Sequence, residues 1–323
     1  MRLPSSVVLV PLAVVFACSA WDGPRKYDQA PADEFLFDRR PLTFECADRL
    51  PGRSGGHPGE VRLRAGNEPP YALTRSEELH LSRSDMPALT ITSDPAGRIA
   101  VGGNERGDWS IRFCARGEGK SQAEAYQQLQ DISMTHLGGV VSINNASRSM
   151  NPYTTGSLLM AAPADAPMII HASYAPVEVR DMSGPLRVTA SHGRATILDT
   201  TGQVDADAFV VDFAGSQGRV TLTAEAEINL KMTATKFDGT ILASAQRPVR
   251  MLVPVGFLTS FQAVVNRPQD FVCRADVCSK VKAEKTTGLY VFTYAGDGSA
   301  SPERVHLRSE QATVVIDNIR RKN

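Results

Sequence analysis

The fold is indicated most clearly by residues 176–202, which read PVEVRDMSGPLRVTASHGRATILDTTG. Apolar and polar residues alternate through this stretch, as in strands with one buried face. Gly184, Gly193 and Gly202 are spaced nine residues apart, and each is followed within two residues by the next apolar position. The stretch therefore predicts a repeat of short strands separated by glycine turns.

This repeat has the size expected of a coil in a stacked β-structure. A strand of about five residues rises roughly 17 Å, so two nine-residue units would make one coil. The alternation would place Val, Leu, Ile and Ala inside, and neighbouring coils would satisfy the backbone hydrogen bonds of all but the end strands. Gly184, Gly193, Gly202 and Gly239 are expected to be structural turn glycines, which need either a positive φ or a close backbone approach.

The section before the repeats, residues 77–174, is expected to contain half-buried strands and one helix. Trp109, Ile111 and Phe113 follow the strand alternation. Ser121-Gln122-Ala123-Glu124 matches a capping box, after which Ala125, Leu129 and Ile132 fall on one helical face. We expect Gly138-Gly139 to end this helix, and residues 175–318 to form the repeats proper. Residues 77–318 are expected to be one continuous domain.

The N-terminus reads as an export signal over residues 1–20. Arg2 is followed by an almost wholly apolar run from Val7 to Ala17, which is too short to span a bilayer core of about 30 Å. Val15-Phe16-Ala17-Cys18 resembles a bacterial lipobox, which would make Cys18 a lipid attachment site. Ordinary cleavage after Ala20 is the alternative. Residues 21–76 are dense in Pro, Gly and charge and are expected to form a tether.

The cysteine count favours an oxidising compartment. Setting Cys18 aside, four cysteines remain of the five: Cys46, Cys114, Cys273 and Cys278. Cys273 and Cys278 flank a four-residue gap that a tight turn can close, which leaves Cys46 with Cys114 by elimination, although three pairings exist in principle. A four-cysteine zinc site is disfavoured, because such sites use two close Cys-x-x-Cys pairs.

Composition excludes several function classes. The formal net charge is zero, so no overall field attracts nucleic acid, and no nucleic-acid partner is expected. The six histidines are scattered without the three-to-five-residue spacing of paired metal ligands. We expect no metal and no cofactor. No apolar run long enough for a transmembrane helix follows the signal, so membrane contact is expected only through an N-terminal lipid anchor.

Several stretches resemble a known family, the bacterial "putative adhesin" or DUF4097-type β-solenoid proteins, in which strands alternate with Ser-Gly or Asn-Gly steps. The matching stretches are residues 176–184, 186–193 and 238–244, and Val253-Pro254-Val255-Gly256-Phe257 resembles a step before the closing coils. The resemblance covers roughly residues 80–318. It implies a right-handed β-solenoid at the bacterial cell envelope, with no catalytic motif to transfer and hence no catalytic residues.

Two functional hypotheses follow. The first is a non-enzymatic envelope protein that presents a β-solenoid surface to an unknown protein or glycan. The second is a polysaccharide-acting enzyme, because stacked-coil folds also host such chemistry. Its candidate carboxylates are Asp199, Asp205, Asp207 and Asp212, of which Asp205 and Asp207 should point to the same outward face of one strand. Solvated surface acids are the favoured interpretation of all four.

Overall fold

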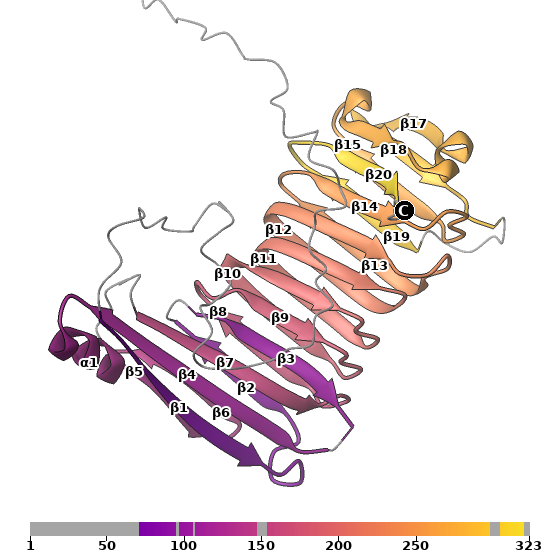
Figure 1. Ribbon diagram of the computed structural model, residues 1–323. Coiled ribbons are helices and arrows are strands. Elements are labelled where there is room, and N and C mark those ends of the chain that lie inside the picture. Colours follow the sequence, from indigo (N-terminus) through magenta and orange to yellow (C-terminus); the bar gives the residue numbers. More distant parts are fainter. Residues whose placement is uncertain (1–70, 95–96, 106, 147–153, 298–303, 320–323) are drawn as a thin grey trace, which may run out of the picture. The chain divides into compact units, whose positions relative to one another are not determined.

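The computed structural model describes residues 71–94, 97–105, 107–146, 154–297 and 304–319. Within these ranges the chain is mainly β, with 20 strands in one hydrogen-bonded network and one α-helix, α1 (Gln122–Asp131). The predicted mainly β class with a single helix is confirmed. Strands stack mostly in parallel along two ladders, which are called ladder A and ladder B below (Figure 1).

Ladder A contains a central run of parallel strands with antiparallel strands at both ends. In spatial order it consists of β5 (Ile132–Leu137), β6 (Val140–Asn145), β2 (Leu89–Ser93), β8 (Met168–Ala172), the first halves of β10 (Leu186–Leu198), β11 (Gln203–Gly215) and β12 (Gln217–Met232), then β13 (Asp238–Ala245), β19 (Val305–Ser309), β15 (Phe261–Val265), β18 (Leu289–Tyr294) and β17 (Lys282–Thr286).

Ladder B also has a central run of parallel strands, but its antiparallel strands lie only at the first end. It shares three long strands with ladder A, because β10, β11 and β12 each continue from one ladder into the other. In spatial order it consists of β1 (Tyr71–Leu81), β4 (Trp109–Gly119), β7 (Thr154–Pro163), β3 (Ile99–Asn104), β9 (Val177–Arg180), the second halves of β10, β11 and β12, then β14 (Val249–Val253), β20 (Val314–Asn318) and β16 (Phe271–Cys273).

The register shows the length of each coil. Leu186 pairs with Met168, which lies two of the predicted nine-residue units earlier in the chain. The step from Val204 to its partner Val220 is shorter than this, and the step from Val220 to its partner Ile241 is longer. Coil length therefore varies, while the register of the apolar positions is kept.

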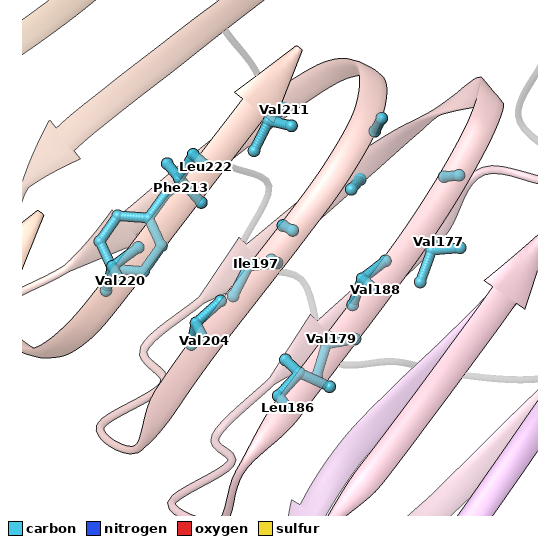
Figure 2. Packing of buried hydrophobic residues seen from close by; sticks show 14 of the residues in the cluster. Val177, Val179, Leu186, Val188, Ile197, Val204, Val211, Phe213, Val220 and Leu222 are labelled. Carbon is cyan, nitrogen blue, oxygen red and sulfur yellow. The ribbon is translucent and has the colours of Figure 1, made fainter. Parts of the chain in front are cut away.

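The core lies between the two ladders and is filled by the alternating apolar residues. Val177, Val188, Ile197 and Val204 are fully buried or nearly so, and Figure 2 shows them with their neighbours from successive coils. At about 1.5–3 kcal/mol for each fully buried aliphatic side chain, one coil buries too few side chains to stay folded alone. Stacking of coils is what stabilises them.

The order of coils in space differs from their order in the chain at both ends. The coil of β2 and β3 lies between that of β6 and β7 and that of β8 and β9. The coil of β19 and β20 lies between that of β13 and β14 and that of β15 and β16. Parallel coils thus begin well before Ala175, and β1 begins at Tyr71, inside the range predicted as a tether.

Both ends of the core are covered by non-repeating elements. At the first end, α1 packs on β4 and β1, and its N-cap Ser121 Oγ accepts from Glu124 N at 3.2 Å, as the capping box predicted. The predicted helix end was wrong: α1 stops at Asp131, Ile132 opens β5, and Gly138-Gly139 turns β5 into β6. A left-handed glycine pair suits a tight hairpin as well as a helix end, and tertiary pairing decided between them.

At the other end, the core is covered by a strand pair and two short 3₁₀ helices, η3 (Pro268–Asp270) and η4 (Asp276–Lys280). Phe271 stacks on Phe292 of β18 with ring centroids 4.1 Å apart. Val277 of η4 is 4% exposed and belongs to the core cluster. The edge strand β17 is fully exposed and reads KAEKT, and charged edge residues of this kind discourage further strand pairing.

Candidate functional site

The strand register defines an exposed surface on the outward side of ladder A. Along β8, β10, β11, β12 and β13, every second side chain points away from the core. Two rows run across the strands. The first row is Thr90, Ile169, Arg187, Asp205, Thr221, Leu242, His306 and Gln262; the second is Thr92, His171, Thr189, Asp207, Thr223, Ser244, Arg308 and Val264. We call these two rows face A.

Face A carries mixed and weakly paired charges. Arg187 Nε lies 3.9 Å from Asp205 Oδ2, with side chains 65% and 51% exposed. Exposed pairs of this kind contribute only about 0–1 kcal/mol. His306 Nδ1 lies 3.3 Å from Gln262 Oε1. The polar groups of face A therefore remain accessible to a partner.

The outward face of ladder B, called face B, is different because its charges are tightly paired. Glu178 bridges Arg98 and Arg180. Asp212 binds Arg194 and accepts from Asn229 Nδ2 at 2.9 Å. Both Asp212 and Asn229 are buried. The ion pairs of this face thus join side chains of neighbouring coils.

The four candidate carboxylates do not converge on one point. Asp205 and Asp207 lie on face A, at outward positions of the same strand, as predicted. Asp212 lies on face B in contact with Arg194 and Asn229. Asp199 is exposed at the turn after β10, with a left-handed φ of 50°. The structure thus places two candidates together and separates them from the other two.

The turn glycines lie where neighbouring coils approach most closely. A Cβ on Gly202 would lie 2.4 Å from Ser183 O and 2.5 Å from Gly184 O, and one on Gly184 would lie 2.4 Å from Asp165 O. Gly193 has Ala175 O at 2.7 Å from its Cβ position, on the opposite turn. Of the four predicted glycines, Gly239 has a positive φ, at 135°. Close approach is the common requirement at these positions, and positive φ is not.

Sequence reasoning missed Gly218, which joins this column: its Cβ position lies 2.9 Å from Gly202 O, and that of Gly239 lies 2.0 Å from Gly218 O. Gly218 breaks the nine-residue spacing because its coil is shorter than two such units. The signal was present in Gln217-Gly218-Arg219-Val220, where a glycine again precedes an apolar strand position by two residues.

A second missed feature is an aromatic stack at the other turn. Tyr174 and His192, on consecutive coils, have ring centroids 5.0 Å apart and nearly parallel planes. Their separation in the sequence is twice the nine-residue unit, or one regular coil, and this could have indicated the contact. Each ring covers one face of the other, and the stack thus joins two consecutive coils.

The cysteine prediction is confirmed for one pair: Cys273 and Cys278 form a disulfide. The loop it closes is anchored by Asp276, whose carboxylate accepts from Gly256 N at 2.7 Å and from Asn318 Nδ2 at 3.0 Å. These hydrogen bonds lower the pKa of Asp276, and the bond from Asn318 has the largest effect. Cys114 is also disulfide-bonded. Its predicted partner Cys46 and the candidate lipid site Cys18 lie outside the described residues.

A shallow depression lies near the second end of the ladders, lined by Lys236, Leu258, Ser260, Asp297 and Arg304. At the end of β18, just before the lining residue Ala295, Tyr294 donates its hydroxyl proton to Phe257 O at 2.9 Å, and burial raises the pKa of this phenol. Across the described ranges, no three His, Cys, Asp or Glu side chains gather as a metal site would require. None of the helices in those ranges combines the length and apolarity needed to cross a bilayer.

Comparisons with known proteins give limited matches. No protein-family model matches the chain, and no curated protein matches it. Among solved structures, it is similar to a "putative cell adhesion protein" from Clostridium sporogenes, with 10% identity, a TM-score of 0.29, and coverage of 76% of this chain and 99% of that one. It is also similar to a "putative adhesin" from Bacteroides fragilis, with 10% identity, a TM-score of 0.27, and coverage of 78% and 99%.

A further similar structure, from Parabacteroides distasonis, has 8% identity and a TM-score of 0.25 over 76% of this chain and 97% of that one. The neighbours are bacterial proteins named for adhesion. With identities and TM-scores this low, the fold of the chain is defined by its own strand pairing, and the DUF4097 resemblance stays a prediction.

Proposed function

We propose that this chain is a non-enzymatic, exported protein of the bacterial cell envelope that binds a protein or glycan partner through face A of a right-handed β-solenoid. The observation that carries the proposal is the contrast between the two outward faces. Face A keeps its charged side chains exposed and weakly paired, whereas face B closes its charges on one another.

The dimensions of face A suit a protein or extended glycan. Eight strands from β2 to β15 span seven gaps of about 4.8 Å, and five residues along a strand span roughly 17 Å. The face therefore covers roughly 600 Å² before side-chain relief is added, near the roughly 800 Å² that one partner contributes to a typical specific interface. Mixed charge along it favours distributed contacts over a single deep pocket.

The alternative function is that of a β-helix enzyme acting on a polysaccharide. One observation favours it: Asp205 and Asp207 project from the same strand and share an exposed face. Against it, Asp212 lies on face B and Asp199 at a turn, so the candidate carboxylates do not converge on one point. We therefore place the enzyme second.

Binding and turnover are separable by experiment. The purified chain is screened on a glycan array and against a panel of polysaccharides for depolymerisation. Charge reversal on face A, Arg187→Glu with Arg308→Glu, should abolish array binding. Arg274→Glu, at an exposed arginine just after β16 and away from face A, should leave it unchanged. Depolymerisation that is lost in Asp205→Asn with Asp207→Asn would instead establish the enzyme.

The envelope location is proposed on the N-terminal sequence. If residues 15–18 act as a lipobox, Cys18 becomes the lipidated N-terminus. Cleavage after Ala20 would instead release the chain without a lipid anchor. Labelling cells with a palmitate analogue distinguishes the two. Incorporation that disappears in Cys18→Ala supports the anchor, and no incorporation into the exported wild-type chain refutes it.

A further inference from the structure

Face B contains apolar residues that are buried although they point away from the core. Leu198, Ala214 and Leu252 are 3%, 4% and 8% exposed. They belong to one row, because Leu198 pairs with Ala214, Ala214 with Lys231, and Lys231 with Leu252. The matched outward residues of face A, Ile169 and Leu242, are 38% and 49% exposed.

This difference requires something that covers face B. The described helices pack elsewhere: α1 lies against Gly117 on the core side of β4, and η4 lies on β18. A polar group indicates the same covering. Asn229 lies in the middle of face B, is 3% exposed, and its Oδ1 has no hydrogen-bond partner among the described residues. A buried amide oxygen normally has a donor, so a donor from a covering segment is expected here.

Cys114 is a covalently bonded residue on face B. It occupies an outward position of β4, between the core residues Phe113 and Ala115, and packs with Ala100 and Leu159 in a small cluster on face B. Cys114 is disulfide-bonded, and Cys273 is bonded to Cys278. The other cysteines of the chain are Cys18 and Cys46, which lie outside the described residues.

We propose that residues 37–70 dock on face B and are fastened there by a disulfide between Cys46 and Cys114. The sequence of this segment fits the role. In Leu42-Thr43-Phe44-Glu45-Cys46, the residues Leu42, Phe44 and Cys46 alternate with polar ones. An extended chain would therefore turn both apolar side chains toward the same surface as the bonding sulfur.

The segment is also long enough. From β4 to β14, ladder B has seven strand gaps of about 4.8 Å, or roughly 34 Å. The chain from Cys46 to the start of β1 at Tyr71 extends up to about 85 Å, which allows a path to β14 and back. Docking would cover Leu198, Ala214 and Leu252, supply donors to Asn229, and leave face A open.

The test uses the full chain with single cysteine probes. Ala214→Cys places a thiol on face B with a small change in volume, and Thr221→Cys places the matched control on face A. In the oxidised chain, maleimide should label the Ala214→Cys thiol at least about tenfold more slowly than the Thr221→Cys thiol. Adding Cys46→Ser with Cys114→Ser should speed the first reaction and leave the second unchanged.

Equal labelling rates for the two probes in the oxidised chain would overturn the proposal. The proposal would also be overturned if the labelling rate of Ala214→Cys fell as protein concentration rose and light scattering detected a dimer. A second copy of the chain would then be what covers face B. Peptide mapping of the unreduced wild-type chain gives an independent test that needs no variant: a linked Cys46–Cys114 peptide is expected, and Cys114 joined to Cys18 refutes this docking.

Discussion

The glycine column gives the sharpest test of the stacked-coil fold, through the substitution Gly202→Ala. The added Cβ would lie 2.4 Å from Ser183 O and 2.5 Å from Gly184 O. Both atoms belong to the backbone of the preceding coil, so neither can rotate away. Coils must separate locally by about 1 Å to restore an ordinary van der Waals contact.

The expected loss follows from the bonds at this turn. Thr201 N donates to Met182 O at 2.8 Å, and a separation of that size would stretch the bond beyond useful length. Losing one backbone hydrogen bond costs about 1 kcal/mol, and overpacking costs about 1–3 kcal/mol. Lower entropy of the unfolded chain offsets about 0.4–1 kcal/mol. The net loss is about 1–3.6 kcal/mol, which lowers the Tm of a domain this size by roughly 2–14 °C.

Thermal melting followed by far-ultraviolet circular dichroism measures the effect, with two controls. Thr221→Ala, on exposed face A, should change stability by no more than about 0.5 kcal/mol. Gly107→Ala has a φ of 82° but no atom within 4 Å of its Cβ position, so it reports conformational strain alone, at about 1–2 kcal/mol. If the Gly202→Ala and Thr221→Ala variants have the same Tm, the close approach of coils at this column of glycines is refuted.

Three further predictions concern the ion pairs and the second end of the ladders. Asp212→Ala should lower the free energy of unfolding, measured by urea titration, by about 2–3 kcal/mol, because it leaves Arg194 and Asn229 without their partner. Asp205→Ala should lower it by about 0–1 kcal/mol. Equal losses would contradict the contrast between the faces. Replacing Cys273 and Cys278 by Ser should lower the free energy of unfolding by about 2 kcal/mol, which is the value expected for a disulfide that closes so short a loop. In this variant, dithiothreitol should have no additional effect at this site. An unchanged urea midpoint would argue against a stabilising role for the disulfide. The pKa of Asp276 is lowered from 3.8 in the folded chain, so the stability that its carboxylate adds is present above about pH 4 and is lost as pH falls through the folded pKa. Asp276→Asn should therefore make the free energy of unfolding fall less steeply with pH in this acid range. An unchanged pH dependence would refute this role.

Local patterns predicted the elements of this protein well. Period-two alternation marked the strands, because a strand with one buried face needs no information beyond its own residues. The capping box marked the start of α1 for the same reason, since Ser121 and Glu124 lie three residues apart. The end of α1 was misjudged because a glycine pair suits either a helix end or a hairpin.

What the sequence by itself determined was therefore a mainly β chain of short strands, the length of the regular coils, and the outward position of Asp205 and Asp207. The tertiary structure alone decided that the coil of β2 and β3 follows that of β6 and β7, and that β19 and β20 insert before β15 and β16. Every coil presents the same alternating pattern to its neighbours, so pattern cannot specify which coils pair. It also decided that Asp212 closes on Arg194 and Asn229, because that contact joins three coils whose spacing in the chain varies.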